Sequence, residues 1–297
     1  MIQQKTFHAI GLMSGTSLDG VDIALIETDG ENHVERKAFE TAYYTSTERN
    51  TIRAALGHKE DDLETRMAEK IVTDKHIALV RNFINNHDLK DKIDIIGFHG
   101  HTIFHDPKNK FTWQIGDSQN LADACGIDVV GDLRKNDVEQ GGQGAPLLPL
   151  YHKALAHDKN MPAAFVNIGG VSNITYINDE ELLAFDCGPG NALLDDFMKD
   201  HFEKDCDEGG ALARTGSPDL DMVRKWMENP YFKNKPPKSL DRDEWDIQEI
   251  QYLPNADGAA TLTHWTVECI KKAVSVCPKQ PKICYITGGG RKNAYLM

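Results

Sequence analysis

Three glycine-rich turns carry the strongest chemical signal in this 297-residue chain. Each follows an apolar segment predicted to be a strand, and they lie at residues 15–20, 169–170 and 288–290. Glycine lets the backbone approach a ligand closely, and unpaired N–H groups at such a turn can face an anion. Any one of them is most simply a plain turn, but three in one acidic chain favour a nucleotide. Neither GxxxxGK[ST] nor GxGxxG occurs as a strand-to-helix element, which argues against a P-loop or Rossmann site.

Asp186 is the candidate general base. It follows a predicted strand at residues 182–185 and precedes the turn Cys187-Gly-Pro-Gly-Asn191. A carboxylate at the end of a strand is held rigidly. A general base needs such a position, because it must lie within hydrogen-bond reach of the proton that it removes. An aspartate that stabilises the turn or caps the next helix is an equally good interpretation.

Arg134 and two histidines are candidate ligand-binding residues. Arg134 lies two residues after Asp132, and its guanidinium could bind a carboxylate or a phosphate bidentately. A structural salt bridge to a neighbouring acid is about equally plausible. His99 and His101 flank a glycine after a predicted strand, but no third metal ligand follows at a suitable spacing. We therefore expect loop histidines that bind a sugar hydroxyl or have no role.

Metal-binding patterns are otherwise sparse. Asp19 and Asp22 straddle the first glycine turn, and either could serve a Mg²⁺ ion, which prefers water-rich octahedral sites with one or two carboxylates. The sequence leaves that assignment open. The six cysteines form no CxxC pair, which argues against zinc and thioredoxin-like sites and favours reduced cytosolic thiols.

The predicted elements that must position these residues alternate between strands and helices. In the first half, we expect strands at 7–13, 21–26 and 33–44 as an antiparallel meander, then a long helix at 62–87 with at most one break. Strands at 93–98, 111–115 and 127–130 and a short helix near Leu121 follow. In the second half, we expect helices at 146–157, 191–202 and 256–277, strands at 163–168, 174–177, 182–185 and 283–286, and an exposed loop at 229–239. This order predicts an α/β class with mixed sheets and two domains, at 1–130 and 131–297.

Composition narrows the class of partner. The 33 Lys and Arg residues against 46 Asp and Glu residues give a net charge of −13. That balance argues against a general binder of nucleic acid or of anionic membranes, because neither polyanion is attracted at long range. The sequence shows no apolar run long enough for a signal peptide or a spanning helix, so we expect a cytoplasmic protein.

Eight short motifs resemble those of the anhydro-N-acetylmuramic acid kinases. In chain order they are GLMSGTSLDGVD (11–22), GFHGHT (97–102), QIGD (114–117), VGDLR (130–134), GGQGAP (141–146), NIGGVSN (167–173), FDCGPGN (185–191) and TGGGRKN (287–293). They span nearly the whole chain. The first motif and GGQGAP are far more specific than a single glycine turn, so the resemblance to this family is strong.

The resemblance implies a fold similar to the sugar kinase, Hsp70 and actin superfamily, with two ribonuclease-H-like domains and ATP in the cleft between them. It assigns ATP binding to all three turns: Gly15, Thr16, Ser17, Leu18, Asp19, Gly20, Val21 and Asp22; Gly169 and Gly170; and Gly288, Gly289 and Gly290. Asp186 matches the family's catalytic aspartate. Arg134 is expected to pair with the lactyl carboxylate of the substrate, with His99, Asp132, Gly188 and Asn191 as further substrate-binding residues.

The implied reaction opens the 1,6-anhydro ring of 1,6-anhydro-N-acetylmuramic acid with water and transfers the γ-phosphoryl group of ATP to O6. Asp186 would deprotonate the water that attacks C1, while backbone amides and Mg²⁺ stabilise the phosphates. The product, N-acetylmuramic acid 6-phosphate, belongs to peptidoglycan recycling and amino-sugar catabolism. The resemblance also implies a homodimer.

Two departures from the family pattern stand out. Members continue for several tens of residues past the TGGGRKN motif, so we expect a second domain truncated at Met297. Cys187 occupies a position where a small hydroxyl residue is common, and without an adjacent base it is expected to pack rather than react.

Two other functions remain open from the sequence. Shared phosphate turns do not fix the acceptor, so another kinase or a phosphatase of the superfamily is one alternative. A non-catalytic regulatory protein that binds sugar or nucleotide is the other. Sugar-dependent release of ADP would separate the latter from a kinase.

Overall fold

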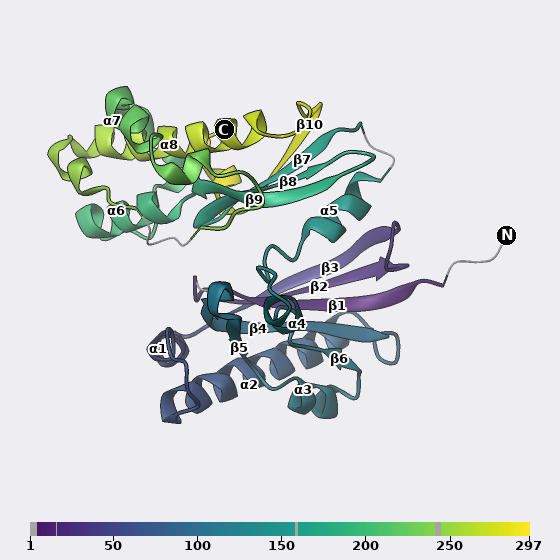
Figure 1. Ribbon diagram of the computed structural model, residues 1–297. Helices are drawn as coiled ribbons and strands as arrows, with labels where there is room; N and C mark the ends of the chain where they lie inside the picture. The colour runs from purple at the N-terminus through teal and green to yellow at the C-terminus, as the bar shows by residue number, and fades with distance from the viewer. Residues whose placement is uncertain (1–4, 16, 158–159, 241–244) are drawn as a thin grey trace. The chain divides into compact units, whose positions relative to one another are not determined.

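The computed structural model describes residues 5–15, 17–157, 160–240 and 245–297. The chain forms two compact units, Met1–Leu147 and Leu148–Met297, each described here by itself (Figure 1). The boundary therefore falls at Leu147 instead of near residue 130. The reason is that residues beyond 130 remain bound to the first unit: the Arg134 side chain, for example, donates a hydrogen bond to His99. Within the described ranges, no helix combines the length and apolar character needed to cross a membrane.

The first unit is built on a mixed sheet with strand order β3-β2-β1-β4-β5. Strands β1 (Phe7–Ser14), β2 (Gly20–Thr28) and β3 (Val34–Tyr43) form an antiparallel meander. Strand β4 (Ile95–Asp106) runs parallel to β1, and β5 (Phe111–Ile115) and β6 (Val129–Val130) both pair with β4. In β2, buried Val21, Ile23 and Leu25 alternate with less buried residues, as one face against a core requires. The predicted meander is confirmed.

Helices cover this sheet and complete its core. They are α1 (Ser46–Ala54), α2 (Leu63–Asn86), α3 (Ser118–Cys125) and α4 (Lys135–Glu139), with a 3₁₀ turn at Pro107–Asn109. Helix α2 begins at a capping box formed by Asp62 and Thr65, and it continues without the break that the sequence allowed. Its buried residues, including Val72, Val80 and Phe83, share one core with the sheet.

The second unit contains a four-stranded sheet with order β10-β7-β8-β9. Strands β7 (Ala163–Ile168), β8 (Val171–Ile177) and β9 (Leu182–Pro189) are an antiparallel meander, and β10 (Ile283–Thr287) runs parallel to β7. The helices are α5 (Pro149–Ala156), α6 (Ala192–Phe202), α7 (Leu220–Trp226) and α8 (Asn255–Ser275), with 3₁₀ turns at Glu208–Gly210, Ala213–Thr215, Pro230–Lys233, Gln248–Tyr252 and Gly289–Lys292. Helix α8 packs on β8, β9, α6 and α7.

Both sheets follow one plan. In each, an antiparallel meander of three strands is followed by a strand that pairs in parallel with the first, giving β3-β2-β1-β4 and β9-β8-β7-β10. Parallel strands need a crossover, and helices supply it in both units: α1 and α2 in the first, and α6 to α8 in the second. The predicted α/β class with two ribonuclease-H-like units is confirmed.

Three local predictions are wrong. Strand β4 continues through His99 and His101, so these histidines are strand residues and not loop residues. Strand β9 extends to Pro189, which places Asp186 inside the strand. The segment 229–239, expected as an exposed loop, buries Tyr231 and Phe232, which are 8% and 4% exposed. Proline and lysine dominate that segment's sequence, but its two aromatic side chains join a core that local patterning does not reveal.

Candidate functional site

The first glycine turn joins β1 to β2 and is anchored by Leu18. The Leu18 N–H donates to the Gly15 carbonyl at 3.0 Å, and the Leu18 side chain is only 2% exposed. The Asp19 carboxylate accepts hydrogen bonds from Ser17 Oγ at 2.7 Å and from the Gly20 N–H at 3.0 Å. Thr16 lies outside the described residues. The turn is thus fixed from inside by an apolar side chain, while Asp19 remains exposed.

The next residues bind the turn to strand β3. A Cβ atom on Gly20 would lie 2.5 Å from the Ala42 carbonyl oxygen, so only glycine permits this approach of β2 to β3. Val21 is buried in the core, whereas Asp22 is exposed and its Oδ1 accepts from Thr41 Oγ1 at 2.6 Å. The two exposed carboxylates of this hairpin, Asp19 and Asp22, are therefore its chemically available groups.

A buried polar network that sequence reasoning missed supports the same turn. Ser14 Oγ lies 3.0 Å from the Tyr44 hydroxyl and 2.8 Å from His101 Nδ1. The Tyr44 backbone N–H also donates to the Asp19 carbonyl at 3.0 Å, so Tyr44 holds both ends of the turn. Burial raises the pKa of Tyr44 to about 12 and lowers the pKa of His101 to about 4, which keeps both side chains neutral at pH 7.

Arg134 and His99, two predicted substrate-binding residues, are in direct contact. Arg134 Nε donates to His99 Nε2 at 2.9 Å, and Arg134 Nη1 donates to the Gly144 carbonyl at 3.0 Å. His99 Nδ1 lies 2.9 Å from the Gly100 carbonyl, which assigns the proton to Nδ1 and leaves Nε2 as the acceptor. Burial, followed by the charge of Arg134, lowers the pKa of His99. Arg134 is therefore aimed by a neutral histidine and a backbone carbonyl, and no ion pair holds it among the described residues.

Asp132 and the GGQGAP loop flank this pair. Asp132 is exposed in a left-handed conformation, with φ of 52°, and its carbonyl accepts from the Lys135 N–H. In the loop, the Gly144 N–H donates to Asp137 Oδ2 at 2.6 Å. Asp137 thereby fixes the carbonyl group to which Arg134 binds.

In the second unit, the turn at Gly169-Gly170 is attached to the start of helix α6. The N–H groups of Gly190 and Ala192 donate to the Gly170 carbonyl, and the Asn191 N–H donates to the Gly169 carbonyl at 2.7 Å. These are the donors that a helix N-terminus would otherwise offer to an anion. An anion at this turn must therefore use other N–H groups.

The third turn, at residues 288–290, packs against Ile168 at the end of β7, next to the turn at Gly169-Gly170. Gly288 has φ of 80° and ψ of 178°, and a Cβ atom there would lie 2.5 Å from the Ile168 carbonyl oxygen. A Cβ atom on Gly290 would lie 2.4 Å from Ile168 Cγ2 and 3.1 Å from Asn191 Oδ1. The Asn191 side chain also donates to the Ile168 carbonyl at 3.2 Å. The second unit thus contains four of the predicted segments: Gly169-Gly170, Gly188, Asn191 and 288–290. All of them except Gly188 meet around Ile168, at the carboxyl ends of β7 and β10.

Asp186 sits beside an irregularity in the β8–β9 pairing. It pairs with Asn173, whereas Gly188 pairs with Ser172, so Cys187 is an extra residue in the ladder. Such bulges re-aim side chains and are frequent near active sites. Burial raises the pKa of Asp186 to about 6, against the opposing effects of a backbone hydrogen bond from Leu240 and the charge of Lys238. A carboxylate with this pKa can both accept and release a proton near neutral pH.

Cys187 and Gly188 face helix α8 and the core. Cys187 is 1% exposed among Val166, Ile174 and Ala273, and burial raises the pKa of its thiol. This environment agrees with the expected packing role. A Cβ atom on Gly188 would lie 2.7 Å from Cys269 Sγ, so Gly188 allows β9 to approach α8 closely.

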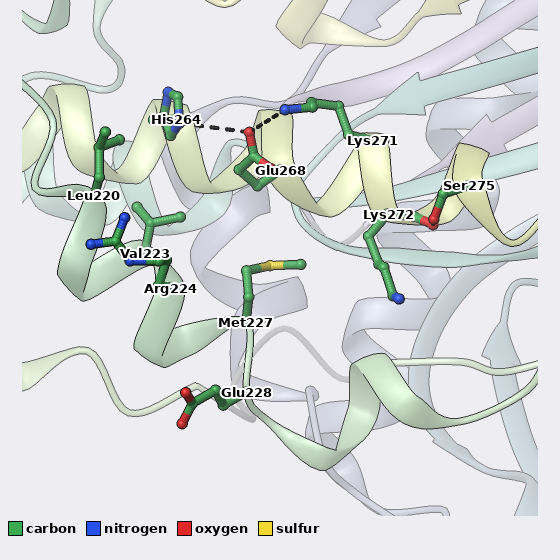
Figure 2. Close-up of a pocket in the computed structure, with 10 residues that line it drawn as sticks. All are labelled: Leu220, Val223, Arg224, Met227, Glu228, His264, Glu268, Lys271, Lys272 and Ser275. Atoms are coloured by element: carbon green, nitrogen blue, oxygen red, sulfur yellow. Dashed lines mark hydrogen bonds and ion pairs between the residues drawn. The ribbon is translucent and has the colours of Figure 1, made fainter.

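Two other features lie apart from these residues. Glu27, His33 and Glu35 form the one group of possible metal ligands found among the described residues, but Lys37 already pairs with both carboxylates, at 3.1 and 2.6 Å. A cavity of about 590 Å³ lies between α7 and α8 and is lined by side chains such as Val223, Met227 and Lys272 (Figure 2). None of the predicted site residues lines it.

The comparisons with known proteins decide the family. A family model described as anhydro-N-acetylmuramic acid kinase matches residues 7–297. The chain belongs to the anhydro-N-acetylmuramic acid kinase family.

Named relatives support this assignment. The chain is 46% identical over 298 residues to the anhydro-N-acetylmuramic acid kinase of Rhizorhabdus wittichii. The alignment covers 97% of this chain and 82% of that protein. The chain is also 44% identical over 301 residues to the enzyme of the same name from Zymomonas mobilis, with the same coverage. Among solved structures, the activator of the 2-hydroxyisocaproyl-CoA dehydratase from Clostridium difficile aligns over 97% of this chain and 82% of that one, with 12% identity and a TM-score of 0.47.

Membership of the anhydro-N-acetylmuramic acid kinase family confirms the resemblance seen in the motifs. The motifs contain two of the residues that hold the site in place, Ser14 and His101, without showing that they are in contact, and the other four lie outside the motifs. The full set is Ser14, Tyr44 and His101 in the first unit, and Tyr231, Lys238 and Leu240 in the second. For the second unit, the available signal was the pair of aromatic residues at 231–232 within an otherwise polar, proline-rich segment.

Proposed function

We propose that this chain is an ATP-dependent kinase that hydrolytically opens 1,6-anhydro-N-acetylmuramic acid and phosphorylates O6, giving N-acetylmuramic acid 6-phosphate. The family match over residues 7–297 and relatives of that name at 43–46% identity support the substrate and the reaction. The observation that carries the chemistry is Asp186, a partly buried carboxylate with a raised pKa of about 6. The activity places the protein in peptidoglycan recycling and amino-sugar catabolism.

Asp186 acts as the general base. Its ionised carboxylate takes a proton from a water molecule as the water oxygen bonds to C1. The bond between C1 and the bridging oxygen breaks, and that oxygen, now O6, bonds to the γ-phosphorus of ATP while ADP departs. The protein's part is to hold the base, the sugar and the phosphate in register, which removes much of the entropic cost of the reaction.

The residues present fit ATP and Mg²⁺. At Gly288 and Gly290 a Cβ atom would collide with Ile168, so glycine lets the turn at 288–290 pack closely against the end of β7. We assign phosphate binding to residues 15–22, Gly169, Gly170 and 288–290. Asp19 and Asp22 offer exposed carboxylate oxygens of the kind Mg²⁺ prefers. When bound, the metal neutralises charge on the phosphates.

Arg134 is proposed to bind the lactyl carboxylate of the sugar. Its Nε and Nη1 groups donate to His99 and Gly144, which leaves Nη2 and the second Nη1 hydrogen for a ligand. Because the guanidinium is already oriented, little side-chain entropy is lost when the sugar binds. His99 thus contributes by aiming Arg134, and Asp132, Gly188 and Asn191 remain proposed substrate-binding residues.

The proposal also covers where the protein is located and how its copies associate. We assign the protein to the cytoplasm and expect two copies to associate as a homodimer. Light scattering coupled to size-exclusion chromatography would report a mass near twice the 33.2 kDa of one chain.

The test of the proposed function is ADP release from ATP, Mg²⁺ and 1,6-anhydro-N-acetylmuramic acid. Asp186→Asn should lower kcat by about 10²- to 10⁴-fold, because the amide cannot accept the proton. Asp200→Asn, an exposed aspartate on α6, is the matched control and should leave kcat unchanged. Undiminished turnover by Asp186→Asn would contradict the role of the base. A folded chain that binds ATP without sugar-dependent ADP release would favour the non-catalytic alternative.

A further inference from the structure

We infer that residues 231–240 form a brace that holds the Asp186 carboxylate in one orientation, and that the Lys238 ammonium is the positive charge of this brace. The inference rests on the proposed function, in which Asp186 is the general base. Tyr231, Lys238 and Leu240 are positioning residues: each acts on the reaction through Asp186.

Three hydrogen bonds join the brace to Asp186. The Leu240 N–H donates to Asp186 Oδ2 at 2.8 Å, which fixes the rotation of the carboxylate. The Asp186 N–H donates to the Lys238 carbonyl at 3.0 Å, and the Tyr231 hydroxyl donates to the Asp186 carbonyl at 2.6 Å. Asp186 is therefore bound at its backbone N–H, its carbonyl and its side chain by one segment.

The sheet topology explains why a brace is needed here. Strand β9 is the last strand in the order β10-β7-β8-β9, so its outer edge carries backbone groups that β8 cannot reach. The bulge at Cys187 further interrupts the pairing with β8 beside Asp186. Residues 238–240 supply partners on that open edge. Without them, the strand that carries the base would be free to move.

The brace is itself anchored in the core. Tyr231 and Phe232 are 8% and 4% exposed, and the Phe232 ring stacks on Trp245 with 5.6 Å between ring centroids. The Asn229 side chain caps the turn by accepting from the Tyr231 N–H at 2.9 Å. A segment fixed in this way can hold Asp186 to within the few tenths of an ångström that catalytic groups require.

The Lys238 side chain is bound within the brace, on the same tyrosine that donates to the Asp186 carbonyl. Its ammonium group sits 4.1 Å from the centroid of the Tyr231 ring and donates to the Tyr231 carbonyl at 3.0 Å. Its charge lowers the pKa of Asp186, opposing the larger effect of burial, while its own pKa is lowered by burial. Among the described residues, the other titratable groups around the pair are Tyr231, Cys187, Cys269 and Lys272.

The first experiment removes the charge. Lys238→Met keeps an aliphatic chain over the Tyr231 ring, and should move the acid limb of the pH profile of kcat/KM upward by roughly half a pH unit or more. Lys238→Arg, which restores the charge, should return the limb toward its original position. Lys235→Met, an exposed lysine of the same segment, is the matched control and should not move it.

The second experiment removes one contact. Tyr231→Phe keeps the ring and deletes the hydroxyl, so kcat should fall by about tenfold while KM for ATP stays within about twofold. Tyr252→Phe, at a tyrosine that is 80% exposed, should change neither. An unmoved acid limb in Lys238→Met together with an unchanged kcat in Tyr231→Phe would overturn the brace.

A readout that is independent of turnover separates this inference from the proposed function. The pKa of Asp186 can be followed by carbon-13 NMR of aspartate carboxyls in the ligand-free chain, with Asp186→Asn to assign the signal. Lys238→Met should raise that pKa even if the wild-type chain releases no ADP. Absence of sugar-dependent turnover with a shifted Asp186 pKa would reject the kinase assignment alone, whereas an unshifted pKa would reject the action of Lys238.

Discussion

The turn at residues 15–19 in the first unit and the turn at Gly169-Gly170 in the second join equivalent pairs of strands, β1–β2 and β7–β8. They are held by different means. Side chains add to backbone bonds in the first: the Tyr44 hydroxyl, Ser14, His101 and the Asp19 carboxylate support it, together with backbone bonds from Leu18 to Gly15 and from Tyr44 to Asp19. Backbone groups hold the second, since the start of α6 donates directly to the carbonyls of Gly169 and Gly170.

This difference determines which changes destabilise each turn. A network of side chains responds to protonation and to the loss of a single hydroxyl group. A backbone attachment is insensitive to both, and it fails when a glycine that allows the close approach is replaced. One topology therefore supports two proposed phosphate-binding turns that are sensitive to different substitutions.

The largest expected difference between the two units is in how their stability depends on pH. Burial lowers the pKa of His76 and of His101 to about 4, from an unfolded value of 6.5. Between these values the unfolded chain binds more protons than the folded one, so stability present above pH 6.5 is lost as the pH falls toward 4. At pH 5 we expect a loss of about 2 kcal/mol for each histidine, or roughly 4 kcal/mol for the first unit. In the second unit His152 is similarly shifted, but Asp186, whose pKa is raised to about 6, binds a proton in the folded state at pH 5 and offsets part of that loss, so the second unit should lose less than half as much.

Hydrogen exchange read by mass spectrometry at pH 7 and pH 5, corrected for the intrinsic rate, can follow the two units separately. His76→Gln should reduce the pH dependence of the first unit, whereas His33→Gln, at an exposed histidine, should not. Equal acid sensitivity of both units would contradict the comparison.

The next largest effect on stability is expected when a glycine of the second unit is replaced. Gly288→Ala places a side chain in a backbone conformation that only glycine adopts readily, with its Cβ atom 2.5 Å from a backbone oxygen. We expect a loss of roughly 2–4 kcal/mol in the free energy of unfolding, measured in urea, and weaker ATP binding. Gly209→Ala is the matched control, since Gly209 also has positive φ but open space around it, and it should cost less.

The smallest effect is the loss of the Tyr44 hydroxyl in the first unit. Tyr44→Phe leaves Ser14 bonded to His101 and should cost about 1 kcal/mol of stability. Because the hydroxyl holds one end of the phosphate turn, KM for ATP should rise severalfold. Tyr176→Phe is the control: it removes a buried hydroxyl bonded to Asn178 in the second unit, so stability should fall similarly while KM for ATP does not change. A rise in KM with both variants would show that general destabilisation, and not the turn, is responsible.

Much of the fold was accessible from local patterns. Strand β7 was predicted at its observed bounds, 163–168, because apolar β-branched and aromatic residues fill it between turn residues. Helix α2 was predicted within one residue at each end, since apolar residues recur along it mostly at helical spacing. The glycine turns and the FDCGPGN segment likewise carry their signal within a few consecutive residues.

The sequence by itself therefore determined the α/β class, the two meanders, the family and the choice of Asp186 as the candidate base. Only the tertiary structure decided what holds that base, because its partners Tyr231 and Leu240 lie 45 and 54 residues away along the chain. The bond between Ser14 and His101 spans 87 residues in the same way. Periodicity reports which face of an element is buried, but it carries no information about which distant residue closes the contact, since chain folding brings such partners together.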